Sequence, residues 1–127
     1  MTDCVLDASA VLADLLGEPG AHQVRSVIHG AFVSAANYAE VIAKLIDKGF
    51  EPLEARRTVD ELPCVIIAVD KACAAEAGML RAETRIAGLS LGDRMCVALA
   101  RRLDLPALTA ERAWKRLDLG VETTLIR

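Results

Sequence analysis

The stretch CVIIAV, residues 64–69, decides which class of fold the sequence predicts. Four of its six side chains are β-branched and none is charged, a pattern typical of a strand that is buried on both faces of a parallel sheet. Pro63 ends the helical pattern before the stretch, and Asp70 is placed to cap the helical pattern after it, which runs from Lys71 to about Ile86. The sequence therefore predicts a buried parallel strand between two helices.

The rest of the chain repeats this alternation of short apolar runs and longer helical patterns. The other predicted strands cover residues 4–6, 31–33, 107–109 and 123–126. The other predicted helices cover residues 10–16, 22–29, 34–48, 52–62, about 90–103 and 110–117. Five strands separated by helices predict one α/β domain over residues 1–127, with a mostly parallel sheet and helices on both of its faces.

Composition supports a single domain with an aliphatic core. The 127 residues suffice for one core, and because 54% of them are hydrophobic but only 3% aromatic, we expect mainly Ala, Val, Leu and Ile inside. No apolar run approaches the roughly 18 residues that a membrane helix needs, and Met1-Thr2-Asp3 lacks the basic region of a signal peptide. We therefore expect a cytoplasmic protein without a membrane-spanning segment.

The cysteines and the charged residues limit the kinds of binding site that the sequence predicts. The four cysteines form no C-x-x-C pair and lie among apolar neighbours, which favours buried, reduced thiols over a zinc site or disulfides. A net charge of −3 argues against a broad electrostatic grip on nucleic acid, but not against a local one. Arginine, a good bidentate phosphate ligand, clusters at Arg94, Arg101, Arg102, Arg112 and Arg116. This cluster indicates either a solvated helix face or contacts with a phosphodiester.

Two acidic residues closely follow predicted strands. Asp7 comes directly after the strand 4–6, and Glu111 comes shortly after the strand 107–109. Open α/β sheets bind their ligands in the crevice beyond the carboxyl ends of the strands. Each residue also has a purely structural interpretation: Asp7 as the cap of the next helix, and Glu111 as an acid favoured by the dipole of the helix that it begins.

Two further acidic residues lie on predicted helices. Glu40 is in the second turn of the helix that Ser34 caps, where an ion pair with Lys44 is the structural alternative. Asp93 lies in LSLGDRMC, residues 89–96, where Ser90 and Asp93 have the spacing of a capping box. Because the residues three, four and seven positions beyond Asp93 are apolar, it also heads the buried stripe of its helix. Both interpretations stay open at Asp93.

Together the four acids predict a metal site. Asp7, Glu40, Asp93 and Glu111 each lie at a strand end or near a helix start, so that all are expected at one edge of the sheet. Converging carboxylates repel one another unless a cation lies between them, and oxygen ligands without Cys or His suit Mg²⁺ or Mn²⁺. Such ions bind phosphate oxygens and activate water, which indicates phosphodiester hydrolysis.

Four segments taken together resemble a PIN-domain ribonuclease, and more narrowly the VapC-type toxins of bacterial toxin–antitoxin pairs. They are VLDASAVLA at 5–13, NYAEVI at 37–42, LSLGDRMCVALA at 89–100 and PALTAERAW at 106–114, so the resemblance covers essentially the whole chain. It implies metal-dependent endonucleolytic cleavage of RNA, with Asp7, Glu40 and Asp93 at the acidic metal-binding positions. It also implies a homodimer and a small VapB-type antitoxin whose C-terminal segment covers the active site.

The same resemblance suggests supporting residues. Ser9 matches a hydroxyl position near the site, and Thr109 precedes the fourth acid. Glu111 stands where the family commonly has Asp; it keeps the charge but adds a methylene, so either a second metal or a water-mediated role stays open. Arg94 and Arg112, each next to an acid in the sequence, are candidates for contacting the phosphate backbone.

Two other classes of function are compatible with the fold. A catalytically inactive PIN-like module would bind RNA or a protein, but such a module need not retain the three leading acids. A phosphoryl-transfer domain of another doubly wound type lacks its expected signals, because the chain contains no GxxxxGK[ST] or GxGxxG string.

Overall fold

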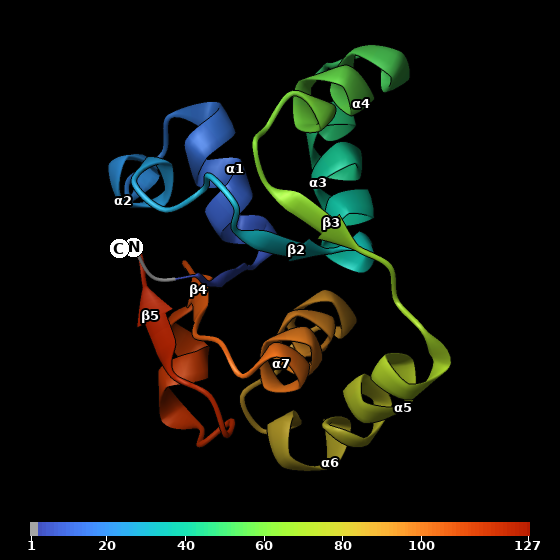
Figure 1. Ribbon diagram of the computed structural model, residues 1–127, viewed down its shortest axis with the longest axis vertical. Helices are drawn as coiled ribbons and strands as arrows, with labels where there is room; N and C mark the ends of the chain where they lie inside the picture. Colours follow the sequence, from blue (N-terminus) through green and yellow to red (C-terminus); the bar gives the residue numbers. More distant parts are fainter. Residues whose placement is uncertain (1–2) are drawn as a thin grey trace.

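The computed structural model describes residues 3–127, so the predicted domain start at Met1 lies outside the described residues. It confirms the α/β class with a sheet of five strands in the order β3-β2-β1-β4-β5, in which every neighbouring pair is parallel (Figure 1). The strands are β1 Val5–Leu6, β2 Phe32–Ser34, β3 Val65–Ile67, β4 Ala107–Thr109 and β5 Thr123–Leu125. The central strand β1 places Val5 opposite Phe32 on one side and Ala107 on the other.

The helices lie on both faces of the sheet, as predicted. They are α1 Ala8–Leu16, α2 Ala21–Arg25, α3 Ala35–Asp47, α4 Pro52–Asp60, α5 Lys71–Met79, α6 Arg81–Thr84, α7 Leu91–Leu103 and a 3₁₀ helix, η1 Arg112–Arg116. Figure 1 shows α1 to α4 on one side of the sheet and α5 to α7 on the other. None of the helices within residues 3–127 is long and apolar enough to cross a membrane.

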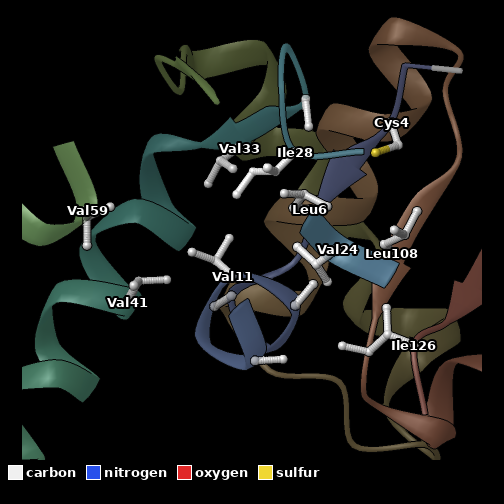
Figure 2. Close-up of a cluster of buried hydrophobic side chains, with 14 of the residues drawn as sticks. Cys4, Leu6, Val11, Val24, Ile28, Val33, Val41, Val59, Leu108 and Ile126 are labelled. Carbon is white, nitrogen blue, oxygen red and sulfur yellow. The ribbon is translucent and has the colours of Figure 1, made fainter. Parts of the chain in front are cut away.

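Each face of the sheet carries its own hydrophobic core, because successive side chains of a strand point to opposite faces. Leu6 of β1 packs with Val11 of α1 and Val41 of α3 in one core, where Figure 2 shows these side chains converging. Val5 of the same strand packs in the other core with residues of α5 and α7 and with Trp114 of η1. Both cores are mainly aliphatic, as the composition predicted, and all four cysteines are free.

The strand that suggested the fold lies at the edge of the sheet. The stretch 64–69 was expected to be buried on both faces, and this expectation is wrong: β3 pairs only with β2, and Val65 and Ile66 are 43% and 39% exposed. Apolar runs indicate that a strand exists but not where it lies in the sheet. The sequence therefore showed where this strand lies along the chain, but not that it lies at the edge of the sheet.

Three predicted helices are divided, much shorter or of another helix type in the structure, whereas the others differ by at most two residues at either end. The helix expected over 71–86 is divided into α5 and α6, and Gly78, a poor helix former, lies just before the break. The helix expected over 22–29 ends at Arg25, where Ser26 Oγ donates to the Gln23 carbonyl. The helix expected over 110–117 is the shorter η1, because the Glu111 N–H is held by the Thr109 hydroxyl and Glu111 stays extended.

Gly20, just before α2, is expected to be the glycine least tolerant of substitution. Its φ of +97° disfavours any L side chain, and a Cβ there would lie 2.7 Å from the Ile126 carbonyl oxygen. We expect Gly20→Ala to reduce the free energy of unfolding, measured by urea denaturation, by about 2 kcal/mol or more. Gly17→Ala is the control, since Gly17 also has a positive φ but open space around its Cβ. Equal losses in the two variants would contradict the proposed packing conflict.

Candidate functional site

The site is built at the carboxyl ends of β1 and β4, beginning with Asp7. The Asp7 N–H donates to the Leu108 carbonyl at 2.9 Å, which continues the pairing of the two strands. Asp7 precedes α1, but its side chain makes no capping hydrogen bond and is only 2% exposed. The interpretation of its carboxylate as a simple helix cap is therefore wrong, and another reason is needed for burying it.

Two hydroxyl groups fix the orientation of this buried carboxylate. Ser9 Oγ donates to Asp7 Oδ2 at 2.8 Å, and Thr109 Oγ1 donates to the same oxygen at 2.9 Å. Both hydroxyls also accept backbone hydrogen bonds, Ser9 from Ala110 N at 2.9 Å and Thr109 from Glu111 N at 3.0 Å. The loop after β4 is thereby tied to the carboxylate, as expected for supporting residues.

The other oxygen of Asp7 is left without a partner. Asp7 Oδ1 is buried and accepts no hydrogen bond from any of residues 3–127, although ionised carboxylates are costly to bury unpaired. The pKa of Asp7 is raised to about 7, mainly by burial and also by the nearby Asp93 and Glu40, although the hydrogen bonds from Ser9 and Thr109 lower it. The unpaired oxygen and the raised pKa of Asp7 together indicate that a positively charged partner is missing at Oδ1.

Asp93 closes a capping box at the start of α7. Asp93 N donates to Ser90 Oγ at 3.1 Å, and Ser90 N donates to Asp93 Oδ2 at 2.9 Å, so the structural interpretation is confirmed. Asp93 is also close enough to Asp7 to raise its pKa, and its role as a site residue stays a prediction beside the capping role. The string GLSLG at 88–92 has the form of a hydrolase nucleophile motif, but α6 precedes it where that motif requires a strand.

Glu40, on α3, is the other carboxylate that lies near enough to Asp7 to raise its pKa. The structure shows no ion pair with Lys44 among the described residues; instead Glu40 Oε1 accepts a hydrogen bond from Asn37 Nδ2 at 3.3 Å. The same Nδ2 donates to the Gly92 carbonyl of α7 at 3.0 Å, which fastens α3 to the first turn of α7. Sequence reasoning missed Asn37 and Gly92 as parts of the site, although the polar Asn37 three residues before Glu40 was a usable signal.

The remaining candidates, Glu111, Arg94 and Arg112, make no hydrogen bond or ion pair with the Asp7 side chain among the described residues. Glu111 is exposed, and the carboxylates that raise the pKa of Asp7 are Asp93 and Glu40. Arg94 is 9% exposed and its Nη1 donates to the Ala77 carbonyl of α5 at 3.0 Å, so a phosphate contact would require that this bond be broken. Arg112 is exposed at the start of η1. The roles of these three residues stay predictions.

Asp93 and Glu40, from two other parts of the chain, thus lie near the buried Asp7, and all three side chains are carboxylates. Within residues 3–127, no three Cys, His, Asp or Glu side chains are already oriented to hold a metal ion. Asp93 Oδ2 is engaged by Ser90, and Glu40 Oε1 by Asn37. The donor set still fits Mg²⁺ or Mn²⁺, because both ions prefer oxygen ligands and Asp7 Oδ1 is free to provide one.

A separate cavity lies away from the acids. Its volume is about 300 Å³. Its lining includes Cys4, Pro106 and Glu122, each of which comes just before a strand, together with Gln23 of α2. Asp7 and Thr109 lie instead at the carboxyl ends of the strands, so this cavity belongs to the opposite edge of the sheet.

Comparisons with known proteins agree with this architecture. A model of the PIN domain family matches residues 4–119, whereas a search of curated proteins found no match. A toxin–antitoxin complex from Klebsiella pneumoniae contains a chain with a TM-score of 0.76 and 18% identity, covering 98% of both chains. DNA-bound VapBC from Salmonella typhimurium gives 0.74 and 18%, covering all of both chains. VapC20 from Mycobacterium tuberculosis, a sarcin-ricin loop cleaving toxin, gives 0.66 and 16%, with 82% of this chain and 86% of VapC20 covered.

Proposed function

The chain belongs to the PIN domain family, and from that premise we propose that it is a metal-dependent endoribonuclease, the toxin of a type II toxin–antitoxin pair. We take residues 1–127 as one PIN domain. The observation that carries the proposal is the buried Asp7 carboxylate, whose Oδ1 is unpaired while Asp93 and Glu40 lie nearby. This arrangement destabilises the protein unless a cation accompanies it, and destabilising features of this kind cluster at functional sites.

In the proposed mechanism, Asp7, Asp93 and Glu40 hold one or two Mg²⁺ or Mn²⁺ ions. Bound there, such an ion supplies an activated water and offsets the charge that develops on the phosphate. Ser9 and Thr109 hold Asp7 Oδ2 by two hydrogen bonds, which leaves Oδ1 facing the site. We propose that the exposed Arg112, which follows Glu111 in the chain, contacts the RNA backbone.

The proposed partners follow from the same assignment. The Klebsiella and Salmonella neighbours were solved as toxin–antitoxin or VapBC assemblies, and VapC20 is described as a toxin that cleaves the sarcin-ricin loop. We propose that this chain likewise acts on RNA, forms a homodimer and is neutralised by a VapB-type antitoxin. We also propose that it acts in the cytoplasm, where such an antitoxin and its RNA target would meet it.

Metal removal is the direct test of the proposed activity. We expect the purified protein to cleave RNA in Mg²⁺ or Mn²⁺, to lose cleavage in excess EDTA, and to regain it when Mn²⁺ is added beyond the chelator. Cleavage is measured on end-labelled RNA by gel electrophoresis, with a preparation of Asp7→Asn purified in parallel to exclude contaminating nucleases. Undiminished cleavage in EDTA would contradict the metal-dependent mechanism.

A non-catalytic PIN-like module that binds RNA or protein is the second candidate. It is favoured by one observation, that no three metal-ligating side chains within residues 3–127 are already oriented around a common ion. Such a module would bind labelled RNA equally in EDTA and in Mn²⁺ and leave it intact. Metal-dependent turnover would exclude it.

A further inference from the structure

The contact between α3 and the first turn of α7 depends on Gly92 having no side chain. A Cβ at this position would overlap Glu40 Oε1 and would lie 3.1 Å from Glu40 Cδ and 3.4 Å from Asn37 Nδ2. The carboxylate of Glu40 therefore occupies the space that any other residue at position 92 would fill. The Glu40 carboxylate therefore lies against the first turn of α7, the turn that also carries Asp93.

Asn37 of α3 provides the hydrogen bond that joins α3 to the first turn of α7 in this contact. It is fully buried, and its Nδ2 donates both to the Gly92 carbonyl at 3.0 Å and to Glu40 Oε1 at 3.3 Å. Its Oδ1 is buried without a partner. A buried amide with an unpaired acceptor lowers stability, and an apolar residue would avoid that loss. What the amide provides is a pair of donors aimed at the helix start and at the carboxylate.

We propose that Gly92 and Asn37 are positioning residues that fix the Glu40 carboxylate beside Asp93 and Asp7. Gly92 leaves the space for the carboxylate, and Asn37 bonds it to the first turn of α7. The inference rests on the proposed function, because it matters only if Glu40 helps to hold the metal ion. It concerns residues for which the four-acid pattern of the sequence predicted no role.

Gly92→Ala is suited to test this because it displaces Glu40 without disrupting the fold. The atom that the new methyl group meets is the far end of a flexible side chain and not backbone. Alanine is also favoured over glycine inside a helix. Gly78→Ala is the matched control: Gly78 lies in α5, and a Cβ there meets nothing within 4 Å.

The readouts are the melting temperature of the protein during Mn²⁺ titration and the Mn²⁺ dependence of RNA cleavage. We expect both alanine variants to melt, without metal, no lower than the parent protein. The Mn²⁺ concentration that gives half of the thermal shift should rise roughly 10- to 100-fold in Gly92→Ala, the range typical for loss of a metal-orienting contact. It should stay unchanged in Gly78→Ala, and half-maximal cleavage should follow the same order.

A double-mutant cycle tests whether the effect passes through Glu40. If it does, Gly92→Ala should weaken Mn²⁺ binding in the parent protein but add nothing in a Glu40→Gln background. Asn37→Leu, similar in size but without a donor, should behave in the same way. A crystal structure of Gly92→Ala should show the Glu40 carboxylate displaced from the start of α7.

The outcomes separate this inference from the function on which it rests. If the parent protein neither cleaves RNA with Mn²⁺ nor gains thermal stability from it, the proposed function is wrong and the inference falls with it. If the parent protein responds to Mn²⁺ and Gly92→Ala responds identically, only the positioning inference is wrong. An equal further loss in the Glu40→Gln background would also overturn it, because the substitution would then act by another route.

Discussion

Replacing Asp7 by asparagine is expected to lower Mn²⁺-dependent RNA cleavage by at least about 100-fold, the upper end of the losses seen when groups around a metal are altered. Asparagine keeps the size of the side chain and the acceptor that Ser9 and Thr109 use, so the fold should be retained. It removes the charge at Oδ1, the buried oxygen that has no partner. The initial rate of cleavage at saturating Mn²⁺ measures the effect.

Asp47→Asn is the matched control for the Asp7 variant. Asp47 is an exposed carboxylate at the end of α3, so this variant changes the net charge equally and should cleave RNA at the parent rate. Circular dichroism establishes that each variant is folded. Asp93→Asn should also lose cleavage, and full activity in both Asp7→Asn and Asp93→Asn would overturn the assignment of the site.

The second large effect concerns stability and pH in the absence of metal. The pKa of Asp7 is raised by burial to about 7, above its ordinary value of 3.8. The folded protein therefore holds a proton that the unfolded chain has released, and this stabilisation is complete below pH 4 and lost as the pH rises through 7. We expect the free energy of unfolding in EDTA to fall by roughly 2–3 kcal/mol between pH 5 and pH 8. Urea denaturation at the two pH values measures it.

Two comparisons assign this pH dependence to Asp7. Asp7→Asn has no proton to lose at this position, so its stability should fall less between the same pH values by about that amount. Saturating Mn²⁺ at pH 8 should restore stability to the parent protein, by about 2.7 kcal/mol at one hundred times the dissociation constant, but not to Asp7→Asn. A parent protein with the same pH dependence as the variant would show that Asp7 is ionised without penalty.

Local patterns in the sequence predicted much of the fold. Short apolar runs and glycine or proline stops located the five strands of the described sheet, and Asp7 was correctly predicted to lie at the carboxyl end of β1. The order of the strands in the sheet was not predictable, because it depends on contacts between distant segments. Val65 and Ile66 were accordingly expected to be buried, and they lie on an edge strand.

The candidate site, too, could be predicted from the sequence only in part. Residue type and spacing identified Asp7, Glu40 and Asp93 as candidates, and the four residues from Ser90 to Asp93 were enough to predict the capping box. The proposed role of Gly92 could not be predicted, because a glycine in a helix does not indicate which side chain approaches it from another helix. The exposure of Glu111 and the burial of Arg94 could not be predicted either, because both depend on contacts with distant parts of the chain.

The hydrogen bond from Thr109 to Asp7 spans 102 residues of the chain, which has a consequence for how the protein is made. Asp7 is synthesised 102 residues before Thr109, which lies in β4, the strand that flanks β1 on one side. Closing so long a loop is the slow, late event of folding. During synthesis, Asp7 therefore gains its full set of hydrogen bonds only after β4 has been made and has paired with β1.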